Sequence, residues 1–162
     1  MNNTNFSGDI LDFLNLLFIH KVKYLIVGGE AVIYYGHARL TGDIDIFYEL
    51  NGKNIEYLYA ALNEFWNGDI PGIESKEELI KVGLIFQFGV PPNRIDLLNT
   101  IEKVKFNEAW EHKVSNEIFY KNKTISIYYI SLDDLIKNKE AVGRYKDQDD
   151  LKFLIAAKKK GV

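Results

Sequence analysis

Two acidic residues alternate with apolar ones in the segment DIDIF. Asp43 and Asp45 flank Ile44, and Ile46 follows. On a β-strand, successive side chains point to opposite faces, so both carboxylates would share one face while the isoleucines enter the core. Adjacent carboxylates repel each other unless a cation compensates, and oxygen-only ligands suit a hard ion such as Mg²⁺. The alternative is that both aspartates lie on a solvated strand face.

A glycine pair ends the apolar run that precedes these acids. Gly28 and Gly29 close the expected buried strand 23–28 and stand before an expected short helix at 30–37. Glycines let the backbone approach a ligand closely, and a helix N-terminus offers free N–H groups to an anion. The alternative is an ordinary tight turn. The P-loop and dinucleotide-binding patterns do not fit, because neither G-K-[ST] nor G-x-G-x-x-G occurs here.

Together, the two motifs resemble the signature of the nucleotidyltransferase superfamily that includes DNA polymerase beta and many small bacterial enzymes. That signature is a hydrophobic residue, Gly, then Gly or Ser, a spacer, and Asp-hydrophobic-Asp or Glu. Val27, Gly28 and Gly29 match the first part. Residues 30–42 form a spacer of thirteen, at the long end of the family's range, and Asp43 to Asp45 match the second part.

A third carboxylate and the C-terminal segment extend the resemblance. Asp96 lies in NRIDLLNT between Ile95 and Leu97, as strand alternation requires, and PPNRID looks like the corresponding part of small stand-alone members. The segment LDDLIKNKEAVGRYKDQDDLKFL resembles their helical end. The resemblance covers about residues 22–155, and this small bacterial type includes abortive-infection and toxin–antitoxin members.

The resemblance implies a mechanism and a set of catalytic residues. Asp43, Asp45 and Asp96 would hold two Mg²⁺ ions, and Asp96 would assist deprotonation of the attacking hydroxyl. One ion would polarise that hydroxyl, while the other would bridge the phosphates of a nucleoside triphosphate and stabilise pyrophosphate. The implied activity is transfer of a nucleoside monophosphate to an acceptor hydroxyl of RNA, protein or a small molecule. The expected substrate class is a nucleoside triphosphate such as ATP, and the sequence leaves the identity of the base open.

The same resemblance assigns residues to nucleotide binding. Gly28 and Gly29 would cradle the phosphates, and Arg39 would reach one of them. Thr41 would orient a carboxylate or a metal-bound water, and Lys139 would bind phosphate from the penultimate helix. A solvated loop arginine and a surface lysine are the alternatives for Arg39 and Lys139. The neighbouring residues that match the family's helical end, or simply cap the last helix, are Arg144, Lys146 and Asp147.

Periodicity predicts a single α+β domain over residues 1–162, which by the resemblance is a nucleotidyltransferase-like mixed β-sheet with flanking helices and a C-terminal helical end at about 131–160. Ser7 is the expected cap of a first helix that ends near His20, and Ser131 caps the penultimate one. Further strands are expected at 43–50, 82–90 and 93–100, with a hairpin over 117–130 that turns near Asn122 and Lys123. Further helices are expected near 55–65, from Ser75, at 106–113, at 132–143 and at 147–160.

Bulk properties exclude several classes of protein. The chain has 162 residues, no cysteine, three histidines and a net charge of −3. Disulfides, thiolate metal sites and cysteine nucleophiles are therefore excluded, and the charge does not indicate a nucleic-acid-binding surface over the whole molecule. No apolar run approaches the roughly 20 residues that span a membrane. Because the N-terminus is polar and does not look secretory, the chain is expected to be cytoplasmic. Its small size and many aromatic residues also make it a candidate homodimer.

Two functional alternatives remain open beside the enzyme. The chain could be a catalytically weak nucleotide-binding regulator or an antitoxin-type partner protein, although three crowded carboxylates are unnecessary for simple binding. A calcium-stabilised structural domain is the weaker option, since the sequence lacks the D-x-[DN]-x-[DN]-G loop. The basic clusters KNKEAVGRYK and AAKKKGV permit a tRNA acceptor without requiring one.

Overall fold

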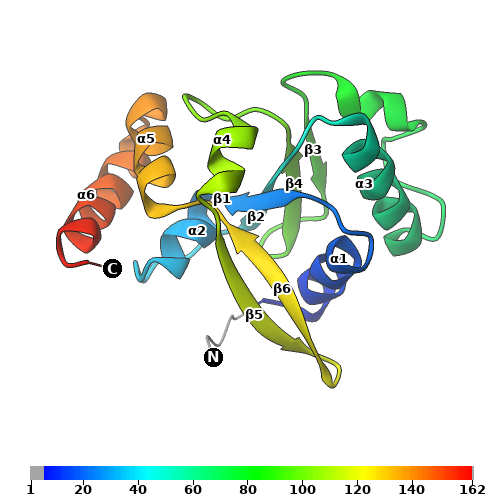
Figure 1. The fold of residues 1–162 in the computed structure, drawn as a ribbon, viewed down its shortest axis with the longest axis horizontal. Helices are drawn as coiled ribbons and strands as arrows, with labels where there is room; N and C mark the ends of the chain where they lie inside the picture. The colour runs from blue at the N-terminus through cyan, green and yellow to red at the C-terminus, as the bar shows by residue number, and fades with distance from the viewer. Residues whose placement is uncertain (1–5, 162) are drawn as a thin grey trace.

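The computed structural model describes residues 6–161, and Figure 1 shows its fold. The expectation for a non-secretory N-terminus rests on residues 1–10, of which residues 1–5 lie outside this range. The elements, in chain order, are α1 (Gly8–Ile19), β1 (Tyr24–Val27), α2 (Gly28–Tyr34), β2 (Asp43–Tyr48), α3 (Gly52–Phe65), the 3-10 helix η1 (Lys76–Ile80), β3 (Ile85–Phe88), β4 (Arg94–Leu98), α4 (Phe106–Glu111), β5 (Val114–Tyr120), β6 (Lys123–Tyr129), α5 (Leu132–Val142) and α6 (Tyr145–Lys159).

The strands form one mixed six-stranded sheet in the order β3-β4-β2-β1-β6-β5. β2 runs parallel to β4 and β1 runs parallel to β6, whereas the β1–β2, β3–β4 and β5–β6 pairs are antiparallel. The chain is therefore an α+β protein with a mixed sheet, as the sequence predicts. β1 lies in the interior of the sheet, and all four of its residues are buried.

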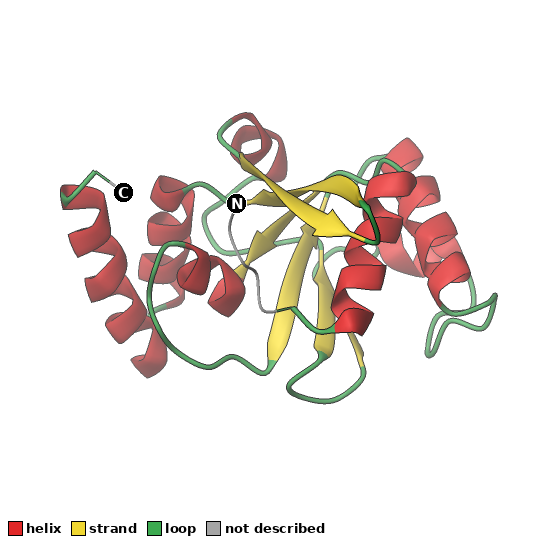
Figure 2. Cartoon of the chain, turned by 90° about the horizontal axis from the view of Figure 1, so that it is seen from below, coloured by secondary structure: helices red, strands yellow, loops and turns green. Residues whose placement is uncertain are grey.

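Helices flank the sheet in two groups, which Figure 2 shows to either side of the yellow strands. α1 packs against α3 and β6, while α5 packs against α6 and α2. Helix α1 begins where the sequence predicts, because the Ser7 hydroxyl accepts a hydrogen bond from the Ile10 N–H at 3.4 Å. Its buried face is supplied by Phe13, Leu14 and Leu17 at helical spacing.

Several boundaries differ from the prediction: α3 begins at Gly52 rather than near 55, β5 at Val114 rather than 117, and α6 at Tyr145 rather than 147. Helix α2 begins at Gly28, two residues before the predicted start, so the glycine pair forms its first turn. Glycine has a low helix propensity, which is why the pattern alone placed the pair outside the helix. The β5–β6 hairpin turns at Lys121 and Asn122, both with positive φ, one residue before the predicted position. None of the helices within residues 6–161 has both the length and the apolar character needed to cross a bilayer.

We predict that Asn54→Ala weakens the contact between α3 and the chain segments at the start of β1 and the end of β2. The buried Asn54 amide accepts a hydrogen bond from the Lys23 N–H at 2.7 Å, and it donates to the carbonyls of Lys23 at 3.0 Å and Glu49 at 2.9 Å. Alanine would leave these backbone groups without partners, so the free energy of unfolding should fall by about 2–3 kcal/mol. Chemical denaturation measures the change.

Asn63→Ala is the matched control on the same helix, because no side-chain hydrogen bond of Asn63 is found within residues 6–161. It should change the free energy of unfolding by less than about 0.5 kcal/mol. Equal losses in the two variants would contradict the assigned role of Asn54.

Candidate functional site

Strand pairing brings the three predicted carboxylates together. In the parallel β2–β4 register, Asp45 lies opposite Asp96, and Asp43 lies opposite Arg94. One carboxylate oxygen from each of the three aspartates lies within 4.8 Å of the others. Ile44 is fully buried beneath them, which confirms that the acids share one face of the sheet and the isoleucine takes the other.

The first turn of α2 packs directly against this acidic cluster. Gly28 has a φ of +65°, and a Cβ built there would lie 2.1 Å from Asp45 Oδ2. A Cβ on Gly29 would lie 2.7 Å from the Thr41 hydroxyl oxygen. A side chain at either position would therefore have to displace Asp45 or Thr41, and Gly28 also needs a backbone conformation that favours glycine. The glycine pair brings the start of α2 as close to the acids as backbone atoms allow.

Arg94 is a site residue that the sequence interpretation missed. Its Nε donates to Asp96 Oδ1 at 2.8 Å, and its Nη2 donates to Asp96 Oδ2 at 3.0 Å and to Asp43 Oδ2 at 2.7 Å. The residue lies in the RID motif, two positions before Asp96 on the same strand face. That spacing was the available signal, since like-facing neighbours of opposite charge form ion pairs.

The environment of the acids shifts their pKa values upward. Burial, followed by the charges of Asp43 and Asp96, raises the pKa of Asp45 to about 7, against a smaller opposing effect of Lys139. Burial also raises the pKa of Asp96, although the hydrogen bonds from Arg94 oppose that rise. Asp45 is thus the member of the cluster with the greatest need for a cation.

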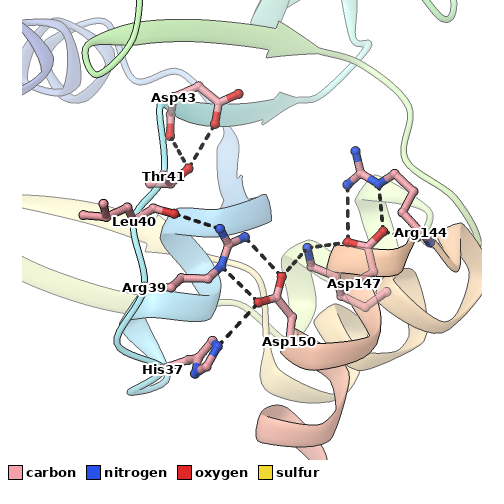
Figure 3. A network of polar contacts seen from close by, with 9 residues as sticks. His37, Arg39, Leu40, Thr41, Asp43, Arg144, Asp147 and Asp150 are labelled. Carbon is pink, nitrogen blue, oxygen red and sulfur yellow. Dashed lines mark hydrogen bonds and ion pairs between the residues drawn. The ribbon is translucent and has the colours of Figure 1, made fainter.

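The loop before β2 lies beside the cluster. The Thr41 hydroxyl donates to Asp43 Oδ1 at 3.2 Å, so it contacts one of the acids that it was predicted to orient. Arg39 points the other way, toward α6, where its Nε lies 3.0 Å from Asp150 Oδ1 (Figure 3). The Arg39 side chain is about one-quarter exposed, so it is partly solvated as well as paired.

Lys139 lies in a buried ionic network at the C-terminal helices. Its side chain is 4% exposed, and its Nζ donates to Asp147 Oδ1 at 2.9 Å and Asp150 Oδ2 at 3.1 Å. The alternative that it is a surface lysine is therefore wrong. Asp147 also accepts from the Arg144 backbone N–H at 3.1 Å and from its Nε at 2.7 Å, so it caps α6 (Figure 3).

This network keeps Asp147 ionised. Burial alone would raise its pKa, but hydrogen bonds from Arg144 and Lys139 outweigh that effect and lower it to about 2. Asp150, the second partner of Lys139, was not among the predicted site residues. Its position depends on how α6 packs against α5, which no local motif in the sequence specifies.

A cavity of about 740 Å³ joins the acidic cluster to the C-terminal helices. Four cationic lining residues come from the loop before β2 and from α5 and the start of α6, whereas the fifth, Arg94, lies on β4, and uncharged side chains from β3 and β4 line the part beyond Asp96. Every predicted site residue borders the cavity. The cationic lining residues are Arg39, Arg94, Lys139, Arg144 and Lys146, and the uncharged ones beyond Asp96 include Ile85, Gln87 and Leu98.

The donor set fits a hard divalent cation. Three carboxylates converge with oxygen atoms only, as magnesium prefers, and neither oxygen of Asp45 accepts a hydrogen bond from any donor within residues 6–161. Asp43 and Asp96 supply further oxygens on the same side of the sheet. The cluster is therefore able to hold such an ion.

One comparison with known proteins bears on this site. A family model described as a nucleotidyltransferase of unknown function (DUF6036) matches residues 9–157. The matched span contains the glycine pair, the three aspartates and the lysine network. A search of curated proteins found no match.

We predict that Gly28→Ala displaces the Asp45 carboxylate and destabilises the fold. The added methyl group would overlap Asp45 Oδ2, and the left-handed backbone adds strain of about 1–2 kcal/mol. Gly68→Ala is the matched control, because Gly68 has a φ of +83° with open space around it. In chemical denaturation, Gly28→Ala should lower the free energy of unfolding by at least about 1 kcal/mol more than Gly68→Ala does. Equal losses would show that the Asp45 carboxylate moves aside without cost.

We also predict a pH-dependent gain in stability from Asp45→Asn when a chelator removes metal. Because the folded-state pKa is raised to about 7 from 3.8, the folded protein retains a proton that the unfolded chain releases. The contribution of Asp45 to the free energy of unfolding therefore falls as pH rises from about 4 to about 7, and it stays low above that range. Asp45→Asn removes this loss.

Thermal unfolding of the two proteins between pH 4 and pH 8 measures this effect. Asp45→Asn should match the wild type near pH 4 and exceed it by about 2–4 kcal/mol at pH 8, from about 1.4 kcal/mol per pKa unit. Asp69→Asn, on an exposed loop, should follow the wild type throughout. A constant offset between Asp45→Asn and the wild type would contradict the raised pKa.

Proposed function

The chain belongs to this family of nucleotidyltransferases, and on that premise we propose that it is a magnesium-dependent enzyme. It transfers a nucleoside monophosphate from a nucleoside triphosphate to an acceptor hydroxyl and releases pyrophosphate. The observation that carries the proposal is the convergence of Asp43, Asp45 and Asp96 within 4.8 Å, beside a helix start that has no side chain. Phosphoryl transfer requires positioning and charge neutralisation above all, and this arrangement provides both.

Each carboxylate has a role in this proposal. Asp43 and Asp45 hold metal, and Asp96 also takes the proton of the acceptor hydroxyl. When bound, Mg²⁺ would neutralise phosphate charge and lower the pKa of the hydroxyl that attacks. The pKa of Asp96 is already raised by burial, which makes it a better proton acceptor than an exposed aspartate.

The two ends of the cavity suit two substrates. Gly28 and Gly29 approach the cavity from one side, and Lys139, Arg144 and Lys146 approach it from α5 and α6. A triphosphate between them would meet backbone N–H groups and positive charge together. The acceptor would then enter from the side of Asp96, past Gln87 and Ile85 of β3.

Transfer to an acceptor can be tested with the purified protein. Each of the four nucleoside triphosphates, labelled on the α-phosphate, is incubated with Mg²⁺ and with RNA, protein or small-molecule fractions of a cell extract. We expect pyrophosphate release and label in one fraction, which identifies the acceptor class. Label in RNA favours a toxin acting on tRNA, label in a protein favours an antitoxin-type modifier, and label in a small molecule favours a resistance enzyme.

The controls separate catalysis from nucleotide binding. Asp96→Asn should reduce pyrophosphate release at least 100-fold, because it removes both a metal ligand and the proton acceptor, whereas the exposed Asp69→Asn should leave it unchanged. Calorimetry could instead show that nucleotide binding does not depend on Mg²⁺, with no pyrophosphate release in any fraction. That result would contradict the proposed enzyme and favour the catalytically weak nucleotide-binding regulator.

A further inference from the structure

Arg94 and the acids form a square of charges across two parallel strands. Asp43 faces Arg94, Asp45 faces Asp96, and all four side chains emerge on the cavity side of the sheet. Arg94 is the one cation in the square. It is next to Asp43 across the strands and next to Asp96 along its own strand, so it can contact both at once.

Hydrogen bonds already occupy most of the oxygens that a metal would use. Arg94 donates to both oxygens of Asp96 and to Oδ2 of Asp43, and Thr41 donates to Oδ1 of Asp43. Gln87 Nε2 adds a weaker contact to Asp96 Oδ2 at 3.3 Å. Of the six carboxylate oxygens in the cluster, the two of Asp45 are those that accept no hydrogen bond from a donor within residues 6–161.

A guanidinium in this position has to move when a divalent ion binds to all three acids. Arginine stays protonated, so it cannot relieve the repulsion from a nearby metal by losing its charge. The Arg94 side chain is 29% exposed and borders the cavity, which gives it room to turn toward the opening. In the proposed function the triphosphate lies in the same cavity, between the glycine pair and the C-terminal helices, and a phosphate at the metal site would offer the guanidinium a new anionic partner.

We propose that Arg94 is a positioning residue that holds Asp43 and Asp96 in place as an internal counter-ion and makes metal and nucleotide binding cooperative. Without nucleotide, a metal ion competes with the guanidinium for the same oxygens and binds weakly. When a nucleotide is bound, its phosphates form hydrogen bonds with the Arg94 guanidinium, and the carboxylates of Asp43 and Asp96 become free to bind metal. This inference rests on the proposed function for the nucleotide, but competition between Arg94 and metal does not depend on turnover.

The first experiment measures Mn²⁺ binding without nucleotide, by electron paramagnetic resonance at pH 8. We expect Arg94→Gln to bind Mn²⁺ about tenfold or more tightly than the wild type, because it removes the competing charge. Arg94→Lys keeps a charge but loses the forked geometry, and its affinity should fall between the two. Lys152→Gln removes the same charge from an exposed position on α6 outside the cavity and should change Mn²⁺ affinity less than about threefold.

Further variants locate the ion and exclude a folding defect. Asp45→Asn combined with Arg94→Gln should abolish the tight Mn²⁺ binding, and retained binding would place the ion elsewhere and overturn the inference. Circular dichroism and thermal unfolding check that each variant is folded. If Arg94→Gln does not fold, Arg94→Lys carries the comparison with the wild type.

The second experiment measures cooperativity through binding of non-hydrolysable nucleoside triphosphate analogues, with and without saturating Mn²⁺. The gain in analogue affinity on adding Mn²⁺ should be at least about fivefold larger in the wild type than in Arg94→Gln. Equal or weaker Mn²⁺ binding by Arg94→Gln in the first experiment would overturn the inference. Tight Mn²⁺ binding by Arg94→Gln with no analogue binding by any protein would instead count against the proposed function.

Discussion

The parallel pairing of β2 with β4 determines the chemistry of this protein. It aligns Asp45 with Asp96 and Asp43 with Arg94 on one face of the sheet, while Ile44 and Ile95 are buried. A shift of one residue in this register would turn one strand's charged side chains toward the core. The hydrophobic alternation that stabilises the sheet therefore also fixes the distances among the carboxylates, so the fold and the acidic cluster are specified by the same contacts.

The acidic cluster is a source of electrostatic strain that the surrounding structure relieves only in part. Arg94 compensates two of the three acids through hydrogen bonds of 2.7–3.0 Å, whereas Asp45 interacts with the more distant charges of Lys139 and Arg144 without a hydrogen bond to either. The glycine at position 28 brings the start of α2 against that same carboxylate. Asp45, which has no hydrogen-bonded cation within residues 6–161, therefore lies next to the backbone that contacts phosphates in the proposed function. A metal–nucleotide complex would supply positive charge at this place.

Local signals in the sequence predicted the elements well and their long-range partners less well. Ser7 and Ser131 cap α1 and α5 as predicted, and the alternation in DIDIF placed both acids on one face. The meeting of Asp96 with that pair followed from family resemblance, because strand order is not encoded within either segment. Arg94 was visible in the RID motif but was given no role, since its partner Asp43 lies 51 residues away. Asp150 was missed for a similar reason, because the packing of α6 on α5 places it beside Lys139.

Four of the five cationic residues that line the cavity, all except Lys146, pair with a carboxylate of the chain, and this pairing bears on which ligands the cavity selects. Arg39 pairs with Asp150, Arg144 pairs with Asp147, and Lys139 pairs with both of these aspartates. A lone anion would have to compete with these carboxylates for each of the four paired cations, and a lone metal ion would have to displace Arg94. A ligand that brings a metal ion and several phosphates together avoids both costs. Its phosphates can bind the arginine side chain that the metal ion displaces, and its metal ion can bind the carboxylates that are left without their cations. On the proposed function, we infer that the site favours a metal–polyphosphate complex over either component alone.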